Sequence, residues 1–381
     1  MCTSTKPSFL MSASFLTACA ERQADGMDEN EDVQRPTHAD LAVDDASVRR
    51  DLTSVPCGVG DDMARMEERL GNESAKDETD AADEPLEMTD HLLGEGATAQ
   101  VWFGKFGAPP HAVGVAVKIV QKAGLDADEL GWIREEIAIH TSLHHSHICK
   151  MYAGWEGGST FTMVLQLCRG GSLCDTMGRA LDDGAPLEEA FVRATFCQLL
   201  GALEHCHSHG VVHRDLKLDN LCWLDDEESH LLLLDFGYAS TRDTHTAFSG
   251  SAHYAAPEVH RTCEAGTVPP APFSASKADV WSAGVCLFAM LATSLPFNGP
   301  EETDEQRAAL RQKIYAGVPD APSGGRVSCS PPALAVLECM LQVEAADRAS
   351  LEEVISHEWI GGMSHVPWQG EGEGEFEEVA L

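Results

Sequence analysis

Hydrophobic and polar positions divide the chain into a patterned middle and two polar ends. Residues 21 to about 87 are rich in Asp, Glu, Ala, Ser and Gly and show little periodicity, with one short candidate helix at Met63 to Leu70. Such a segment buries too little apolar surface to offset the entropy lost on ordering, so residues 1–87 are expected to form a disordered acidic tail. A passive solvated role is favoured for this tail over a regulatory one. The Gly- and Glu-rich residues 362–381 are expected to form a second tail.

Between the tails, apolar residues follow strand spacing first and helical spacing afterwards. Strands are predicted on both sides of the loop at Leu93–Val101, at Val115–Lys118 and over Phe161–Leu167. Longer stretches with near-helical spacing predict helices over Leu130–Leu143, Pro186–His209, Leu334–Leu341 and Ser350–Trp359. One face of the second helix is expected to carry Phe191, Ala194, Thr195, Leu199 and Leu203.

The formal net charge of −36 is unevenly distributed along the chain. Residues 1–88 hold 21 acidic and 8 basic residues, and the last twenty residues hold 5 glutamates and no Lys or Arg. An acidic protein repels phosphate backbones and anionic lipid heads, which argues against nucleic acid and membrane surfaces as partners. Basic peptides are compatible with this charge.

The cysteines and the first twenty residues bear on cellular location. Thirteen cysteines have no regular spacing and no C-x-x-C pair, so buried reduced thiols explain them better than a disulfide framework. Lys6, the mostly apolar Phe9–Ala20 and the small residues Ala18-Cys19-Ala20 loosely resemble a secretory signal. Serines and threonines interrupt that apolar run. A targeting peptide is therefore disfavoured, and a cytoplasmic or nuclear location is expected.

The strongest chemical signal is the octapeptide H-R-D-L-K-L-D-N at His213–Asn220, followed by an apolar run that ends at Asp235-Phe236-Gly237. Together they place two acids, a lysine and an amide on adjacent loops. Phosphoryl transfer needs such a set, because a carboxylate orients the attacking hydroxyl and a cation neutralises the moving phosphate, while an amide and a second carboxylate hold Mg²⁺. An isolated D-F-G would carry little weight, but the combined motif is specific.

Through these motifs the chain resembles the eukaryotic Ser/Thr protein kinases over roughly residues 88–361. The wording of Ser249–Glu258 is most similar to the calcium/calmodulin-dependent and AMP-activated group. The resemblance implies an α+β, bilobal fold, with a small β-rich N-lobe and hinge at residues 88–168 and a larger, mainly α-helical C-lobe at 169–361. It also implies ATP and Mg²⁺ as cofactors and protein hydroxyls as phosphate acceptors.

The same resemblance implies which residues bind the nucleotide. Leu93–Val101 fits the G-x-G-x-x-G-x-V loop over the phosphates, with Ala99 in place of the third glycine. The departure is mild, because the third position is the least demanding sterically, and looser nucleotide binding is its one expected cost. Val115–Lys118 fits V-A-I-K, which makes Lys118 the ligand of the α- and β-phosphates. Leu165 would be the gatekeeper behind the adenine, and Gln166 to Cys168 would offer backbone groups to its edge. The full implied set is Leu93, Gly94, Glu95, Gly96, Ala97, Val101, Ala116, Lys118, Leu165, Gln166, Cys168, Asn220 and Asp235.

The resemblance further implies that Asp215, Lys217, Lys118 and Glu136 act in catalysis. Asp215 would orient the hydroxyl or accept its proton, and Lys217 would stabilise the transferring phosphate. Asn220 and Asp235 would hold Mg²⁺. Glu136 aligns best as the partner of Lys118, and Glu135 is the alternative because the start of the helix at Leu130 is uncertain.

The segment from Asp235 to Glu258 corresponds to the kinase activation segment. Aligned on Gly250-Ser251, Ala247 stands where relatives carry their activating threonine. Thr246 lies one residue away, and Thr244 or Ser249 are substitutes, so an upstream kinase acting near Thr246 is a candidate partner. In relatives, the arginine at the position of Arg214 commonly pairs with such a phosphate.

Other positions imply contacts that hold the C-lobe together or select the substrate. The implied contacts are Ser251 with Asp215 and Lys217, Glu258 with Arg348, and Asp279 with the backbone of the catalytic loop. Ser172 replaces the glutamate that relatives with an arginine preference usually carry, whereas Asp219 supplies the other usual acid. A preference for basic substrates is therefore in doubt but not excluded.

Two features admit a second interpretation, and a third indicates an insertion. Val280–Phe297 has no charged residue over eighteen positions, enough to span a membrane, but the resemblance assigns it to the central buried helix of the large lobe. The histidines at 144–147 and 205–209 suggest a zinc site, yet the resemblance gives them structural positions. The long link after Glu258, with Pro269, Pro270 and Pro272, predicts a surface insertion.

The sequence therefore predicts an active Ser/Thr protein kinase that transfers the γ-phosphate of Mg·ATP to protein hydroxyls. A catalytically weak or inactive pseudokinase scaffold is the first alternative, disfavoured because Lys118, Asp215, Asn220 and Asp235 are all present. A small-molecule phosphotransferase of kinase-like fold is the second. Such enzymes lack the Ala256-Pro257-Glu258 element and the helix introduced by Asp279.

Overall fold

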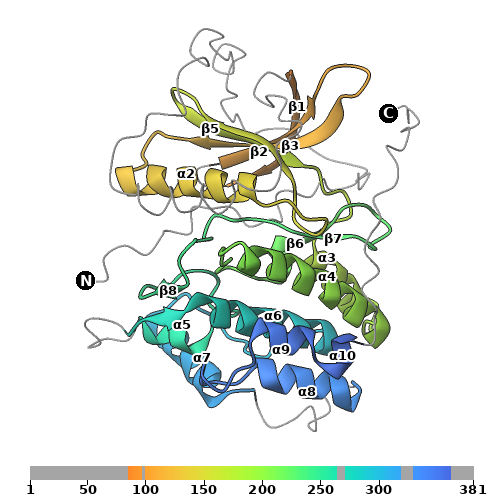
Figure 1. Cartoon of the computed structure of the whole chain (residues 1–381), viewed down its shortest axis with the longest axis vertical. Coiled ribbons are helices and arrows are strands. Elements are labelled where there is room, and N and C mark those ends of the chain that lie inside the picture. Colours follow the sequence, from red (N-terminus) through yellow and green to blue (C-terminus); the bar gives the residue numbers. More distant parts are fainter. Residues whose placement is uncertain (1–84, 97–98, 264–270, 319–328, 362–381) are drawn as a thin grey trace, which may run out of the picture.

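The chain folds into two lobes, one above the other in Figure 1. The computed structural model describes residues 85–96, 99–263, 271–318 and 329–361. The smaller lobe holds a five-stranded sheet and one long helix, and the larger lobe is mainly helical. The prediction of a bilobal α+β fold is therefore confirmed. Residues 1–84 and 362–381, the expected helix at Met63 to Leu70, and the prolines 269 and 270 lie outside the described residues.

The sheet of the small lobe is antiparallel throughout, in the order β1-β2-β3-β5-β4. Its strands are β1 (Leu86–Glu95), β2 (Ala99–Phe106), β3 (Val113–Gln121), β4 (Met151–Glu156) and β5 (Thr160–Gln166). Side chains alternate between the two faces of a strand. In β3, Ala116 and Val120 therefore join the apolar cluster of the inner face, whereas Val115 and Val117 join a separate cluster on the outer face. Lys118 lies in register with the inner set.

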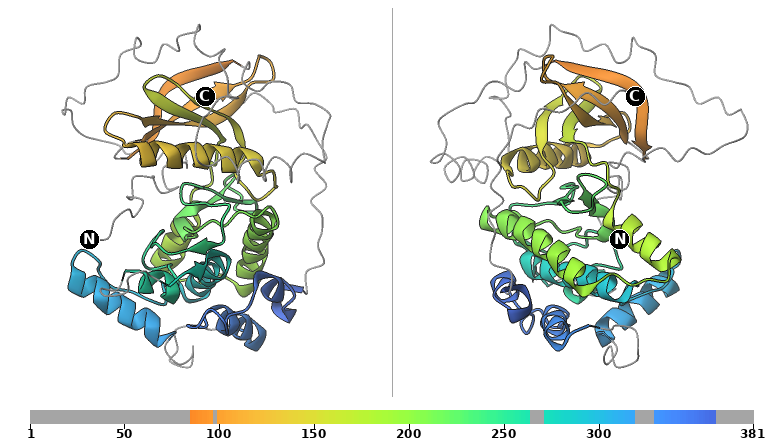
Figure 2. Two further views of the ribbon diagram at one scale, coloured as in Figure 1. Left: turned by 60° about the vertical axis from the view of Figure 1, so that its left-hand side comes forward. Right: turned by 90° about the vertical axis from the view of Figure 1, so that its right-hand side faces the viewer.

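Helix α2 (Ala127–Ser142) lies along the inner face of the sheet, between it and the large lobe (Figures 1 and 2). It begins three residues before the predicted start at Leu130, because Asp126 and Glu129 form a capping box that satisfies free N–H groups of the first turn. Ile133 and Ile137 pack in the inner cluster of the sheet. This packing fixes the rotation of the helix and buries Glu136.

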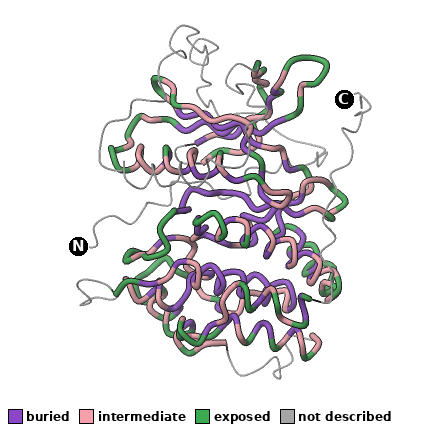
Figure 3. Tube along the Cα trace, in the orientation of Figure 1, coloured by how far each residue is buried: buried purple, intermediate pink, exposed green. Residues whose placement is uncertain are grey.

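The large lobe is built around helix α6, which most of the other helices of this lobe surround. The helices of this lobe are α3 (Leu173–Asp182), α4 (Glu189–Ser208), α5 (Pro257–Arg261), α6 (Ala275–Ala292), α7 (Asp304–Ala316), α8 (Pro331–Met340), α9 (Leu351–Ile355) and α10 (Glu358–Gly361). Two short hairpin-like sheets pair β6 (Leu221–Trp223) with β7 (Leu231–Leu233), and β8 (Thr244–His245) with β9 (Phe273–Ser274). Figure 3 shows the buried residues concentrated at the centre of both lobes and at their junction.

Helix α6 is, within the described residues, the single helix long and apolar enough to cross a membrane, and 83% of that stretch is buried inside the protein. This agrees with the predicted central helix of the large lobe. Its bounds differ from Val280–Phe297, because Ser274 caps its first turn and Thr293 ends it with a left-handed φ of 53°. Phe297 instead lies beyond the helix and stacks on Trp281, with ring centroids 5.6 Å apart.

The buried face of α4 is rotated from the predicted one. Thr195, Leu199 and Leu203 are buried as expected, but Val192 and Phe196 are buried where Phe191 and Ala194 were predicted. Phe191 still contributes at the edge, since its ring lies 5.8 Å from that of Trp223. The helix delivers the chain through His209 to the loop that carries His213–Asn220.

Candidate active site

The loop at His213–Asn220, which we call the catalytic loop, is held from below by Asp279 of α6. Its carboxylate accepts the backbone N–H groups of His213 (2.9 Å) and Arg214 (2.8 Å), and it lies 2.9 Å from Nε2 of His207. Asp279 is only 1% exposed. Burial alone would raise its pKa, but the contact with His207 and the backbone bonds outweigh burial and hold the pKa below its ordinary value. The expected anchoring of the loop by Asp279 is therefore confirmed.

Two non-glycine residues of this region have left-handed backbones, Arg214 with φ 67° and Asp235 with φ 63°. Such conformations are costly for L-residues and persist where the surroundings hold them. The bonds from Asp279 hold the first. At Gly250, φ is 85° and an added Cβ would lie 2.4 Å from the carbonyl oxygen of Arg214, so only glycine lets the activation segment approach the loop this closely.

Asp215 is surrounded by hydrogen-bond donors from the catalytic loop and the activation segment. Its Oδ1 accepts the N–H (2.8 Å) and the hydroxyl (2.9 Å) of Ser251, and its Oδ2 lies 3.1 Å from Nζ of Lys217. The amide of Asn220 donates to the carbonyl oxygen of Asp215 (2.9 Å). Burial, followed by repulsion from Asp235, raises the pKa of Asp215 although Lys217 lowers it. The predicted contacts of Ser251 with Asp215 and Lys217 are both present, the latter at 3.2 Å.

Lys118 of β3 is paired with Glu136 of α2, at 2.7 Å and with both side chains buried. The structure thus selects Glu136 over Glu135. Burial opposes the charge on Lys118, but the carboxylates of Glu136 and Asp235 outweigh burial and raise the pKa of this lysine. The second oxygen of Glu136 is buried and has no partner within the described residues.

Phe236 connects α2 to the catalytic loop. Its ring centroid lies 4.6 Å from that of His140, at the end of α2, and 5.1 Å from that of His213. His140 also donates from Nε2 to the carbonyl of Cys149 (2.6 Å). Burial lowers the pKa of His140 to about 4, so this histidine is neutral in the folded protein near neutral pH. These contacts place Asp235 beside Lys118.

The predicted nucleotide residues of the small lobe lie on β1, β2, β3 and the end of β5. Gly94 pairs with Val101 and Glu95 with Gln100, and the N–H of Gly96 donates to the carbonyl of Ala99 (2.8 Å). Ala97 lies outside the described residues. Ala99 belongs to extended strand β2 and is buried, so a side chain is accommodated where relatives have glycine. One buried cluster unites Val101, Ala116, Leu165 and Cys168, with Leu93 packed against it.

At the end of β5 only part of the predicted hinge backbone is available to a ligand. The N–H of Gln166 donates to the carbonyl of Lys150 (2.8 Å), and the thiol of Cys149 lies 3.6 Å from the carbonyl oxygen of Gln166. Cys222 and Leu234, which the sequence interpretation missed, belong to the same buried cluster as Leu165. Their positions in the sequence could have identified them, because Cys222 follows Asn220 by two residues and Leu234 directly precedes Asp235.

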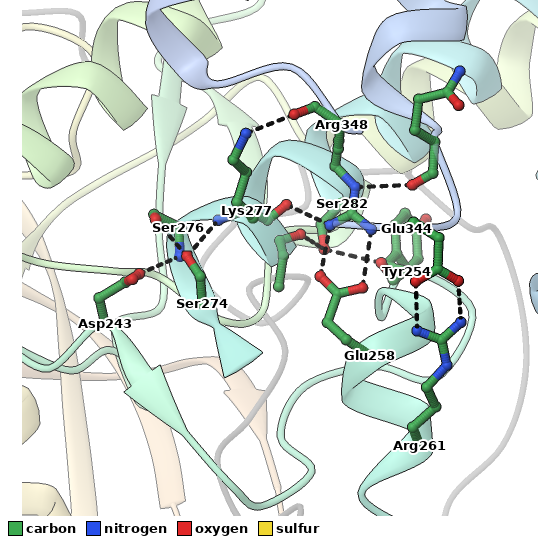
Figure 4. Close-up of polar contacts among 12 residues, drawn as sticks. Asp243, Tyr254, Glu258, Arg261, Ser274, Ser276, Lys277, Ser282, Glu344 and Arg348 are labelled. Atoms are coloured by element: carbon green, nitrogen blue, oxygen red, sulfur yellow. Dashed lines mark hydrogen bonds and ion pairs between the residues drawn. The ribbon is translucent and has the colours of Figure 1, made fainter. Parts of the chain in front are cut away.

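The end of the activation segment is fastened to the large lobe by an ion pair (Figure 4). Arg348 binds both carboxylate oxygens of Glu258, at 2.6 and 2.9 Å, as predicted. It also donates to the carbonyls of Lys277 (2.7 Å) and Gln342 (3.1 Å), and its guanidinium lies 5.1 Å from the ring centroid of Trp281. Arg348 is 1% exposed.

The candidate phosphorylation positions differ in accessibility. Thr244, Thr246 and Ala247 are exposed, whereas Ser249 is buried. Arg214, the expected partner of such a phosphate, donates from one guanidinium nitrogen to the carbonyl of Tyr238 (3.2 Å). Burial lowers its pKa to about 10.

The rings of the histidines near α4 contact one another, in one stacked pair and two tilted pairs. Ring centroids of His145 and His205 lie 5.1 Å apart, those of His147 and His230 4.8 Å, and those of His205 and His209 4.1 Å. His147 Nδ1 also donates to the carbonyl of Leu231 (3.0 Å). Throughout the described ranges, no group of three or more His, Cys, Asp or Glu side chains is arranged to hold a metal ion.

Comparison with known proteins places the chain in a family. The sequence model of the protein kinase domain matches residues 88–360. Maternal embryonic leucine zipper kinase of Danio rerio is 34% identical over 300 residues, which cover 74% of this chain and 40% of that protein. The same kinase of Xenopus tropicalis is 35% identical over 262 residues, with 67% and 36% covered. Serine/threonine-protein kinase SIK2 of Gallus gallus is 32% identical over 249 residues, with 65% and 28% covered.

The chain therefore belongs to the protein kinase family. The recognition of a Ser/Thr kinase most similar to the calcium/calmodulin-dependent and AMP-activated group is confirmed by these relatives. The chain spans two fifths or less of the length of the curated relatives it matches.

Proposed function

We propose that the chain is a Ser/Thr protein kinase that transfers the γ-phosphate of ATP to hydroxyl groups of protein substrates. The observation that carries this proposal is the arrangement around Asp215, where Lys217, Asn220 and Ser251 surround one buried carboxylate and Asp235 and Lys118 lie close by. Membership of the protein kinase family supports it.

In the proposed reaction the acceptor hydroxyl attacks the γ-phosphorus while the bond from that phosphorus to the bridging oxygen breaks and ADP leaves. Asp215 orients the hydroxyl and takes up its proton, a role that its raised pKa favours. Lys217, hydrogen-bonded to Ser251, provides positive charge to the transferring phosphate. Lys118 binds the α- and β-phosphates, and Glu136 fixes the position of its ammonium group.

Asn220 and Asp235 are the residues that we propose hold Mg²⁺. The amide and carboxylate oxygens of this pair are the hard ligands that Mg²⁺ prefers. Asp235 also adds to the raised pKa of Asp215, so two carboxylates lie near each other where a cation would relieve their repulsion. When bound, the ion neutralises negative charge on the phosphates.

Proteins with basic segments are the proposed substrates. The net charge of −36 and the partly exposed Asp219 of the catalytic loop support this. Ser172 does not replace the missing acid, because it is buried and its hydroxyl caps the first turn of α3. The same charge favours protein over nucleic acid or membrane partners. We further propose a cytoplasmic location, where ATP is plentiful, and an upstream kinase acting near Thr246 as a regulator.

The proposed function is tested by transfer of radiolabelled phosphate from ATP to a degenerate peptide array. Wild type should label Ser and Thr peptides, Lys118→Met should lower labelling about 10²–10³-fold, and Asp215→Ala should abolish it. Asp215→Ala should leave nucleotide affinity nearly intact, because Asp215 acts on the acceptor hydroxyl. Labelling by Asp215→Ala at the wild-type rate would refute the assignment of the base. Failure of the wild type to label any peptide, even after treatment with an upstream kinase, would favour a scaffold.

A further inference from the structure

Asp243, in the middle of the activation segment, contacts the first turn of α6. Its Oδ1 accepts the N–H of Ser276 (2.7 Å), and its carbonyl oxygen accepts the N–H of Ala275 (2.7 Å) (Figure 4). The first turn of a helix has N–H groups without partners inside the helix. Ser274, the N-cap residue, accepts a third N–H from Lys277 (3.4 Å). The activation segment thus supplies two of the acceptors that this helix end needs.

Strand pairing supports the same contact. Thr244 pairs with Ser274 and His245 with Phe273, which joins β8 of the activation segment to β9 directly before α6. His245 Nε2 donates to the carbonyl of Arg242 (2.7 Å) and closes a turn around Asp243. Burial opposes the charge on Asp243, but the bonds from Ser276 and Ser274 outweigh it and lower the pKa of this carboxyl. The acceptor is therefore ionised at neutral pH.

Helix α6 contacts the activation segment at two more points and the catalytic loop at one. Ser282 donates to the carbonyl of Tyr254 (2.9 Å), and the carbonyl of Lys277 shares Arg348 with Glu258. Asp279, one turn after Ala275, carries the catalytic loop. The first two turns of one helix therefore fix both the loop with Asp215 and the segment with Ser251.

These contacts order the segment without a phosphate. Every partner in them is a backbone or side-chain group of the chain itself, and Ala247 has no hydroxyl to phosphorylate. Downstream of Asp243, Phe248 packs on His260, with ring centroids 5.3 Å apart, and His260 Nε2 donates to the carbonyl of Ala252 (2.9 Å). Ser251 then reaches Asp215.

We propose that Asp243 is a positioning residue, which docks the activation segment on the first turn of α6 and so prepares the peptide-binding side of the active site without phosphorylation. The consequence for peptide binding rests on the proposed kinase function. The structural part, docking of residues 241–250, does not.

The test compares Asp243→Ala with Asp243→Asn in the full chain after phosphatase treatment, with loss of phosphate verified by mass. Hydrogen exchange of residues 241–250 and steady-state kinetics with a peptide taken from the array are measured. Asparagine is as good an acceptor for helix N–H groups as aspartate, whereas alanine offers none. Asp243→Ala should raise exchange in this segment and raise the KM for peptide about three- to tenfold, the range expected for losing one such acceptor, with the KM for ATP unchanged. Asp243→Asn should restore both values.

Ser350→Ala is the matched control. Ser350 caps α9 through the N–H of Glu353 (3.2 Å) and contacts no part of the activation segment in the described structure. It should lower the melting temperature about as much as Asp243→Ala while leaving exchange of residues 241–250 and the KM for peptide unchanged. A role of Asp243 in stability alone would make the two variants alike, and that result would overturn the proposal.

Failure of the proposal is distinguishable from failure of the kinase function. Wild-type exchange in residues 241–250 of Asp243→Ala would overturn the docking role whether or not the protein transfers phosphate. If the wild type transfers no phosphate but Asp243→Ala still raises hydrogen exchange in residues 241–250, the docking role is supported and only the proposed kinase function fails. Increased exchange with an unchanged KM for peptide would overturn the link from docking to substrate binding.

Discussion

Two buried ion pairs hold the active site, and they differ in how completely their charges are satisfied. Arg348 binds both oxygens of Glu258, two carbonyls and the face of Trp281. Lys118 binds one oxygen of Glu136, and the other oxygen is buried without a partner in the described residues. A buried ion pair offsets its desolvation only when its remaining hydrogen-bonding capacity is used. The Arg348–Glu258 pair is therefore fully satisfied, whereas the Lys118–Glu136 pair leaves one carboxylate oxygen without a partner in the described part of the chain.

Loss of the Arg348–Glu258 pair should have the largest effect on the free energy of unfolding. Arg348→Ala leaves Glu258 and two carbonyls without their buried partner, and about 3–5 kcal/mol of the unfolding free energy should be lost. Arg348→Lys should lose less, because a lysine keeps the charge but cannot bind both oxygens of Glu258 in a planar fork. Urea denaturation measures both. If the unfolding free energy of Arg348→Ala lies within about 1 kcal/mol of the wild-type value, the contrast between the two pairs does not hold. That difference is roughly what a surface ion pair contributes.

Removing Lys118 should affect turnover more than folding. Lys118→Met should lower phosphate transfer about 10²–10³-fold, the usual effect of losing one electrostatic contact to a reacting group. The loss of stability should be smaller than for Arg348→Ala, because methionine fills a volume similar to that of lysine. Single-turnover transfer and urea denaturation give the two numbers. The reverse ranking, with large destabilisation and little loss of turnover, would contradict the assigned roles.

Acid should weaken the packing of α2, the helix that carries Glu136 of the Lys118–Glu136 pair. The pKa of His140 is about 4 in the fold and 6.5 ordinarily, so its contribution to stability is complete above pH 6.5 and is lost as pH falls towards 4. This one group should remove about 2 kcal/mol of the unfolding free energy between pH 7 and 5. Unfolding of wild type and His140→Gln as a function of pH measures the effect. Parallel curves for the two proteins would exclude His140 as the source.

The smallest expected effect distinguishes the roles of the neighbouring carboxylates Glu136 and Glu135. Glu136→Gln should lower transfer about tenfold, because a neutral amide holds the Lys118 ammonium less firmly than a carboxylate. Glu135→Gln should leave transfer unchanged, since the structure pairs Lys118 with Glu136. Initial rates at saturating peptide, with ATP varied, measure both. Equal losses in the two variants would mean that the rotation of α2 differs in solution.

The sequence predicted the residues whose spacing within a motif is short and fixed. Asp215, Lys217 and Asn220 share one loop, so their proximity hardly depends on the rest of the fold. Glu136 could only be ranked above Glu135, because the choice depends on the start of α2, and the capping box at Asp126 sets that start.

Contacts between distant segments that no family motif covers could not be predicted, whereas the family resemblance did imply the contact of Asp279 with the catalytic loop. Asp243 and Ser276 are 33 residues apart, and neither hydrophobic spacing nor a motif links them. The face of α4 was misassigned for a related reason. Val192 and Phe196 are buried by elements that arrive from elsewhere in the chain, including Trp359 of α10, whose ring lies 6.3 Å from that of Phe196.

The attachment of both loops to α6 has a mechanical consequence. Asp215 and Ser251 are both held in place by contacts with helix α6, whereas Lys118 and Glu136 belong to the sheet and α2 of the small lobe. A rocking motion of the small lobe would change the separation of Lys118 from Asp235 and leave that of Asp215 from Ser251 unaltered. Under the proposed kinase function, such a motion would open the nucleotide side of the site and leave the peptide-binding side unchanged.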